Sequence, residues 1–119
     1  MKRSDELIDL SREHHGALRL ARQLQRGEHV PDLDSQLDTL LAHFAEEEYR
    51  FADTLDTTAG DRALYARLKD EHVALEQALR QAIHGLGLTR AGELLAAHVR
   101  FEERELFERI EALGALVEI

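Results

Sequence analysis

The sequence predicts an all-α protein, folded as an up-down-up-down antiparallel four-helix bundle. Apolar residues recur every three or four positions in four separate segments, which is the period of a helix with one buried face. Short links join these segments, and short links between helices of similar length place consecutive helices antiparallel. No segment keeps a period of two, so strands are not expected. We expect one domain that spans residues 1–119.

The first two helices are separated by the sequence RGEHVPD. Gly27 suits the C-terminus of the first helix, and Pro31 suits the first turn of the second. The predicted inward stripe of the first helix is Leu7, Leu10, His14, Ala17, Ala21 and Leu24. The stripe of the second helix is Leu33, Leu37, Leu40, Phe44, Glu47 and Phe51, and this helix closes in DTTAGD.

The third helix is expected from about Asp61 to the sequence HGLGL, and the fourth from a cap at Thr89. The third stripe is Leu64, Leu68, His72, Leu75, Leu79 and Ala82. The fourth is Ala91, Leu95, His98, Glu102, Leu106, Ile110 and Leu113. At 1.5 Å per residue, helices of about 20 to 28 residues would be roughly 30 to 40 Å long.

Composition excludes several classes of function. The net charge is −9, which argues against a nucleic-acid partner because phosphates require basic surfaces. Without cysteine there is no disulfide, thiolate ligand or thiol nucleophile. We see neither a signal peptide nor an apolar run near the roughly 18 residues of a membrane span, so we expect a cytoplasmic protein with no membrane partner. Neither a glycine-rich phosphate loop nor a Ser-His-Asp constellation is visible.

Each of the four inward stripes contains a polar residue. Burying an unpaired histidine or carboxylate costs several kcal/mol unless something satisfies it. These residues fall near the middle of each segment, so antiparallel helices would bring them to one layer. They are His14 in the first helix, His43 and Glu47 in the second, His72 in the third, and His98 and Glu102 in the fourth.

A metal ion would explain such a layer. Residues four apart lie on one face of a helix, so His43 with Glu47, and His98 with Glu102, can each reach a single centre. Imidazole and carboxylate together suit Fe, Mn, Zn or Cu and argue against Mg or Ca. A carboxylate can also bridge two metal ions, which favours a dinuclear site. The candidate ligands are His14, His15, His43, Glu47, His72, His98 and Glu102.

Some assignments stay open in the sequence. His14 continues the apolar stripe of its helix, whereas His15 is either an outer partner or a second ligand. Glu76 follows His72 by four residues and is a candidate third carboxylate. Gly16 and Gly92 lie inside helices, either simply tolerated or allowing a neighbouring helix or small ligand to approach. The acids flanking the ligands are expected on a solvated face; they are Glu46, Glu48 and Glu103.

The motifs REHH (12–15), HFAEEE (43–48), DEHVALE (70–76) and HVRFEE (98–103) resemble those of the hemerythrin-like family, the HHE cation-binding domains, over essentially the whole chain. Ferritin-like bundles differ, because their Glu-x-x-His pair has the glutamate first. The resemblance implies two iron ions with an oxo or hydroxo bridge. It implies that Glu47 and Glu102 also bridge the irons and that the histidines complete the shells. Dioxygen or another small diatomic such as nitric oxide would bind at an open position.

The chain departs from the family's oxygen carriers in two helices. In those carriers the third helix supplies two histidines four apart, and the fourth a histidine with an aspartate five residues on. Here the corresponding pairs are His72 with Glu76 and His98 with Glu102. A ligand set richer in carboxylate favours ferric iron, and hence sensing, storage or oxidation chemistry over reversible carriage.

Three functions follow as expectations. The leading one is a di-iron protein that binds dioxygen, nitric oxide or iron itself. The second is a di-iron enzyme acting on peroxide, nitric oxide or ferrous iron. The third is a structural bundle with zinc or no metal. Signalling would need a separate protein partner, and a homodimer through a helix face is an alternative.

Overall fold

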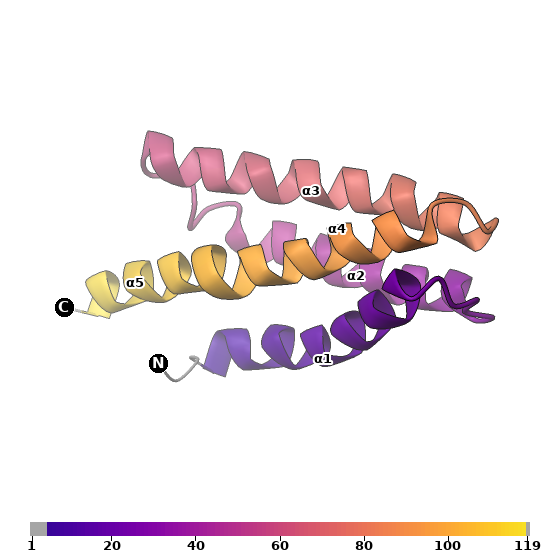
Figure 1. Cartoon of the computed structure of the whole chain (residues 1–119). Helices are drawn as coiled ribbons and strands as arrows, with labels where there is room; N and C mark the ends of the chain where they lie inside the picture. Colours follow the sequence, from indigo (N-terminus) through magenta and orange to yellow (C-terminus); the bar gives the residue numbers. More distant parts are fainter. Residues whose placement is uncertain (1–4, 119) are drawn as a thin grey trace.

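The computed structural model describes residues 5–118, and all of its regular structure is helical (Figure 1). Its elements are α1 (Asp5–Gln25), α2 (Leu33–Phe51), α3 (Ala59–Ile83), α4 (Leu88–Phe101), η1 (Glu102–Leu106) and α5 (Phe107–Glu118). The last three follow one another without a break, so the chain forms four helical rods. No strand occurs among residues 5–118. The prediction of an all-α fold with four helical segments is confirmed.

The four rods lie side by side in an elongated molecule of 50 × 26 × 19 Å. In Figure 1 the α1–α2 and α3–α4 links lie at one end, and the α2–α3 link lies at the other. α1 packs closely along α4, and α3 packs against both α2 and α4. α1 meets α2 only loosely. None of the described helices is long and apolar enough to cross a membrane.

The observed ends of the helices match the ends predicted from the sequence only in part. Gly27 follows α1 with φ +73°, a conformation that glycine adopts without strain. The Thr58 side chain caps α3 by accepting a hydrogen bond from the Asp61 backbone N–H at 3.1 Å. The predicted cap at Thr89 is wrong, because α4 begins one residue earlier, after Gly87.

The core consists of two apolar clusters with a polar layer between them. The first cluster contains Leu20, Leu24, Leu33, Leu37, Leu75, Leu79 and Leu95, among others. The second contains Leu7, Leu10, Phe51, Leu68, Phe101, Leu106 and Phe107, among others. Every rod contributes to both clusters, and the buried histidines and glutamates lie at or near the boundary between the two contributions along each rod.

Gly92 allows the close packing of α1 on α4. A Cβ atom at Gly92 would lie 2.6 Å from the carbonyl oxygen of Ala21 and 2.7 Å from the backbone nitrogen of Gln25. Of the two explanations for this glycine, the approach of a neighbouring helix is therefore the correct one. Gly16 differs, because a Cβ atom there would meet nothing within 4 Å.

Candidate metal centre

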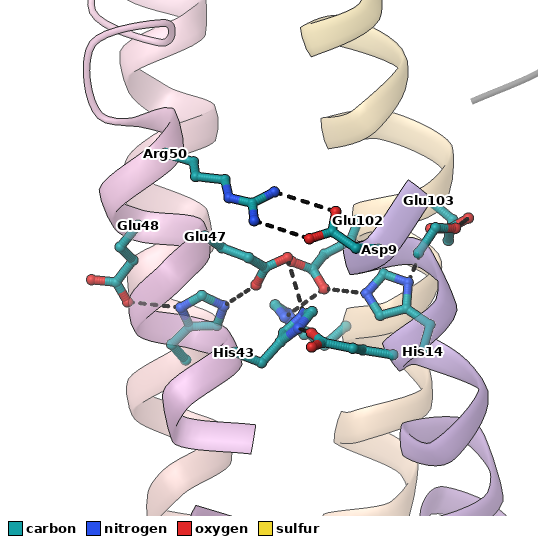
Figure 2. A network of polar contacts seen from close by, with 12 residues as sticks. Asp9, His14, His43, Glu47, Glu48, Arg50, Glu102 and Glu103 are labelled. Carbon is teal, nitrogen blue, oxygen red and sulfur yellow. Dashed lines mark hydrogen bonds and ion pairs between the residues drawn. The ribbon is translucent and has the colours of Figure 1, made fainter. Parts of the chain in front are cut away.

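Six buried residues from the four rods form two overlapping groups of potential metal ligands. One group is His14, His43, Glu47 and Glu102, and the other is Glu47, His72, His98 and Glu102. Within each group the ligand atoms all lie within 4.8 Å of one another. We call Glu47 and Glu102 the inner carboxylates, because both belong to both groups. Figure 2 shows them facing each other between the helices.

The inner carboxylates face the Nε2 atoms of all four histidines. His14 Nε2 lies 2.9 Å from Glu102 Oε1, and His72 Nε2 lies 3.1 Å from Glu47 Oε1. His43 Nε2 lies 3.3 Å from Glu47, and His98 Nε2 lies 3.3 Å from Glu102. Each inner carboxylate is therefore flanked by two imidazoles, one from its own helix and one from another.

A second set of four glutamates contacts the opposite side of each imidazole, and we call them the outer carboxylates. An ionised carboxylate only accepts hydrogen bonds, so each imidazole donates to its outer carboxylate through Nδ1, and its Nε2 would be the atom that offers a lone pair to a metal ion at the centre. The Nδ1 contacts are His14 to Glu103 at 2.9 Å, His72 to Glu48 at 2.7 Å, His98 to Glu71 at 2.7 Å, and His43 to Glu13.

The outer carboxylates form a closed ring around the bundle. Glu13 of α1 contacts the histidine of α2, Glu48 of α2 that of α3, and Glu71 of α3 that of α4. Glu103 of η1 returns to the histidine of α1. Each rod thus orients the imidazole of the next, and part of this ring is visible in Figure 2.

Two sequence expectations about acids need correction. Glu48 and Glu103 were placed on a solvated face, yet both are partly buried and bind histidines on other helices. Only Glu46 is exposed as expected, paired with Arg50 at 2.7 Å. Helical phase could not show this, because each acid serves a neighbouring helix. The available signal was that each outer carboxylate is adjacent in the chain to a buried His or Glu of the site.

The remaining candidates lie outside both groups. His15 is exposed, because one residue step turns a helix by 100° away from the inward face of His14. Glu76 binds the Arg80 guanidinium at 2.7 Å instead of reaching the centre, despite its spacing from His72. The structure thus brings together six of the seven predicted ligands.

Four polar atoms at the centre are buried without a hydrogen-bond partner: His43 Nε2, Glu47 Oε2, His98 Nε2 and Glu102 Oε2. Leaving such a group unpaired costs about 1–3 kcal/mol, so native proteins rarely do it. Metal ions would satisfy these atoms. Each group offers two imidazole nitrogens and carboxylate oxygens, a donor set suited to Fe, Mn, Zn or Cu. The residues present therefore fit a pair of metal ions.

The carboxylates of the centre shift the pKa values of two buried histidines upward. Burial opposes the charging of His43, but the neighbouring carboxylates of Glu47 and Glu13 raise its pKa to about 9. Burial likewise opposes the charging of His98, and Glu102 with Glu71 raises its pKa to about 9. Burial and the facing Glu102 raise the pKa of Glu47.

The pKa of Glu102 shifts in the opposite direction from the pKa of Glu47. Burial alone would raise the pKa of Glu102, but the neighbouring side chains of Glu47, His14 and His98 hold it well below its usual range. One inner carboxylate therefore stays ionised while its partner is more easily protonated. An ionised buried carboxylate places negative charge at the centre, which favours the binding of metal cations.

The π-helical turn η1 begins at Glu102, inside the centre. The Phe107 backbone N–H donates to the Glu102 carbonyl, five residues back, which inserts one extra residue into the rod. Glu102 then reaches the centre while Glu103 reaches His14 on α1. The apolar spacing predicts one regular helix through this region. The adjacent buried pairs, Phe101 with Glu102 and Leu106 with Phe107, were the signal.

A cavity of about 160 Å³ adjoins the centre between α1, α2 and α4. His14, His43, His98 and Glu102 form its inner end. It lies where α1 packs only loosely on α2. The centre is therefore accessible to small molecules from one side.

Comparison with known proteins does not assign this chain to a family. No protein-family model, no curated protein and no solved structure matches this chain. The geometry of the centre and the motifs that it contains are therefore what indicate a function.

Proposed function

We propose that this chain is a hemerythrin-like domain that holds two non-haem iron ions and binds dioxygen, another small diatomic or iron itself for sensing, storage or carriage. The observation that carries the proposal is that Glu47 and Glu102 belong to both groups of potential ligands. Two carboxylates shared by two pairs of histidines are the arrangement that a bridged pair of metal ions needs.

The proposed topology is the antiparallel up-down-up-down bundle. Along α1 the order is second cluster, polar layer, first cluster, and along α2 this order is reversed. It reverses again in α3 and in the rod that begins with α4. This alternation, together with the positions of the links in Figure 1, supports the topology.

Each metal ion would be held by two histidines and the inner carboxylates. His14 and His43 would hold one ion, and His72 and His98 the other. When bound, iron would supply redox chemistry with dioxygen and affinity for small diatomic molecules. The outer carboxylates orient the imidazoles and raise their basicity as ligands. The two apolar clusters exclude water from above and below the polar layer.

The charge of the centre supports sensing, storage or oxidation chemistry over reversible carriage. Six carboxylates surround the site, the two inner and the four outer ones. Oxygen donors and negative charge stabilise the more highly charged ferric ion relative to the ferrous ion. Iron held in the ferric state would be suited to storage or signalling.

Metal content of matched variants tests the proposal. Glu47→Gln and Glu102→Gln each remove one charge of the shared pair and should lower bound iron from two ions per chain, because both groups lose a ligand. Glu76→Gln is the control, since Glu76 follows a histidine at the same spacing but binds Arg80. Equal iron loss in all three variants, or none in the first two, would refute the shared-carboxylate geometry.

The cavity favours a second candidate function, an enzyme acting on peroxide, nitric oxide or ferrous iron. A cavity that reaches His14, His43 and Glu102 gives a small substrate a route to the centre. Steady turnover of one of these substrates by the iron-loaded protein, absent in His43→Ala, would establish it. Stoichiometric zinc with no redox activity would instead support a structural bundle.

A further inference from the structure

The cavity beside the centre is larger than a diatomic molecule requires. Its volume is about 160 Å³. Its walls are mainly the apolar side chains of Ala17, Leu20, Leu40, Phe44, Leu95 and Val99. Its polar groups lie at the two ends: the imidazoles and Glu102 inside, and Glu13, Gln36 and Thr39 near the surface.

Volume and lining together define the size and polarity of a ligand. An apolar cavity of about 150 Å³ in a protein stays dry and binds benzene or xenon, because water needs two to four polar partners. Six of the residues that line this cavity have side chains made only of carbon and hydrogen. A water molecule there would lose hydrogen bonds, whereas an apolar molecule would gain dispersion contacts.

Charge excludes anions from the same space. Glu102 lies at the inner end of the cavity, and six carboxylates in all surround the centre, the two inner and the four outer ones. The Glu13 side chain is 56% exposed and lies near the opening, and the whole chain carries a net charge of −9. An approaching anion is repelled at both ends of the cavity.

We propose that this cavity is a binding site for an uncharged, largely apolar organic molecule of about benzene size, held against the position formed by His14 and His43. The proposal rests on the proposed function only for the metal ion that the molecule would meet at the inner end. The apolar walls and the opening between α1 and α2 belong to the chain itself.

Gly16 provides a way to close the cavity without disturbing the fold. It lies on α1 at the opening, and a Cβ atom there would meet nothing within 4 Å. Gly16→Leu should therefore fold, with its side chain at the opening. Thr39→Phe, at an exposed position on α2 that lines the same cavity, is an independent second block. Gly114→Leu is the matched control, because Gly114 is also helical and unobstructed but lies outside the cavity.

The experiment measures thermal unfolding and the methyl NMR shifts of Leu20, Leu40 and Leu95, with benzene or benzoate added to the purified protein. Iron is quantified in every sample. Benzene at ten times its dissociation constant should increase the folding equilibrium constant about elevenfold and raise the Tm. It should shift the three leucine signals in the wild type and in Gly114→Leu. Benzoate should do neither.

The variants Gly16→Leu and Thr39→Phe show whether benzene binds in this cavity. Loss of the benzene effect in Gly16→Leu and Thr39→Phe, with iron content unchanged, supports the proposal. A benzene effect that persists in both variants, or its absence from the wild type, overturns it, as does equally tight binding of benzoate. Benzene binding without iron would leave the cavity site standing while refuting the proposed function. Iron binding without benzene binding would refute the cavity site and leave the proposed function standing.

Discussion

Glu48 offers the sharpest test of the outer carboxylates, because sequence periodicity alone assigns it to solvent. Its carboxylate accepts from His72 Nδ1 at 2.7 Å and is 34% exposed. Removing an outer partner of a metal-bound histidine typically weakens metal binding 10–100-fold, or about 1.4–2.7 kcal/mol. We expect Glu48→Ala to fall in this range. Glu48→Gln should lose less, because an amide oxygen still accepts from Nδ1.

Glu46→Ala is the matched control for that prediction. Glu46 lies two residues earlier on α2 and forms only an exposed pair with Arg50, worth at most about 1 kcal/mol of folding stability. Its loss should leave metal affinity unchanged. The assay is a competition titration of each metal-free variant against a chromophoric chelator at pH 7. An unchanged affinity in Glu48→Ala, or an equal loss in Glu46→Ala, would refute the ring of outer carboxylates.

Two further predictions concern stability. Gly92→Ala should lower the free energy of unfolding by about 1–3 kcal/mol, because its Cβ would overlap the α1 backbone. Gly16→Ala should raise the free energy of unfolding by up to about 1 kcal/mol, because alanine has the higher helix propensity. Urea unfolding of both variants measures these changes. In the metal-free protein, His43 and His98 have pKa values raised from 6.5 to about 9, so their stabilising effect is complete below pH 6.5 and is lost as the pH rises through 9. Metal affinity should rise over the same range, because metal ions displace these protons. The Tm of the metal-free protein should therefore fall between about pH 7.5 and 9, whereas the Tm of the metal-saturated protein should stay nearly level, because neither the metal-bound fold nor the unfolded chain binds these protons there.

The fold and the inward-facing polar residues could be predicted because both follow from helical period. The stripe that contains Leu10, His14 and Ala17 shows which side of α1 is buried, and the equivalent stripes do so in the other rods. Burial also separates His14 from His15, which no spacing rule could do with certainty. Likewise, only the structure shows that Glu76 turns to Arg80.

Features that depend on contacts between helices could not be predicted in this way. The partner of Glu48 lies on α3 and that of Glu103 on α1, and a single-helix pattern carries no information about either. The π turn at Glu102 interrupts the regular period on which the fourth stripe was based. The cavity depends on the loose packing of α1 against α2, which follows from the whole bundle.

The central claim is that two metal ions share Glu47 and Glu102. Its most direct test is elemental analysis of the protein purified without an affinity tag, combined with anaerobic titration of the metal-free protein with ferrous iron. We predict two iron ions per chain, one for each group of ligands. A titration that ends at one ion per chain, or a folded protein that binds none, would contradict the account.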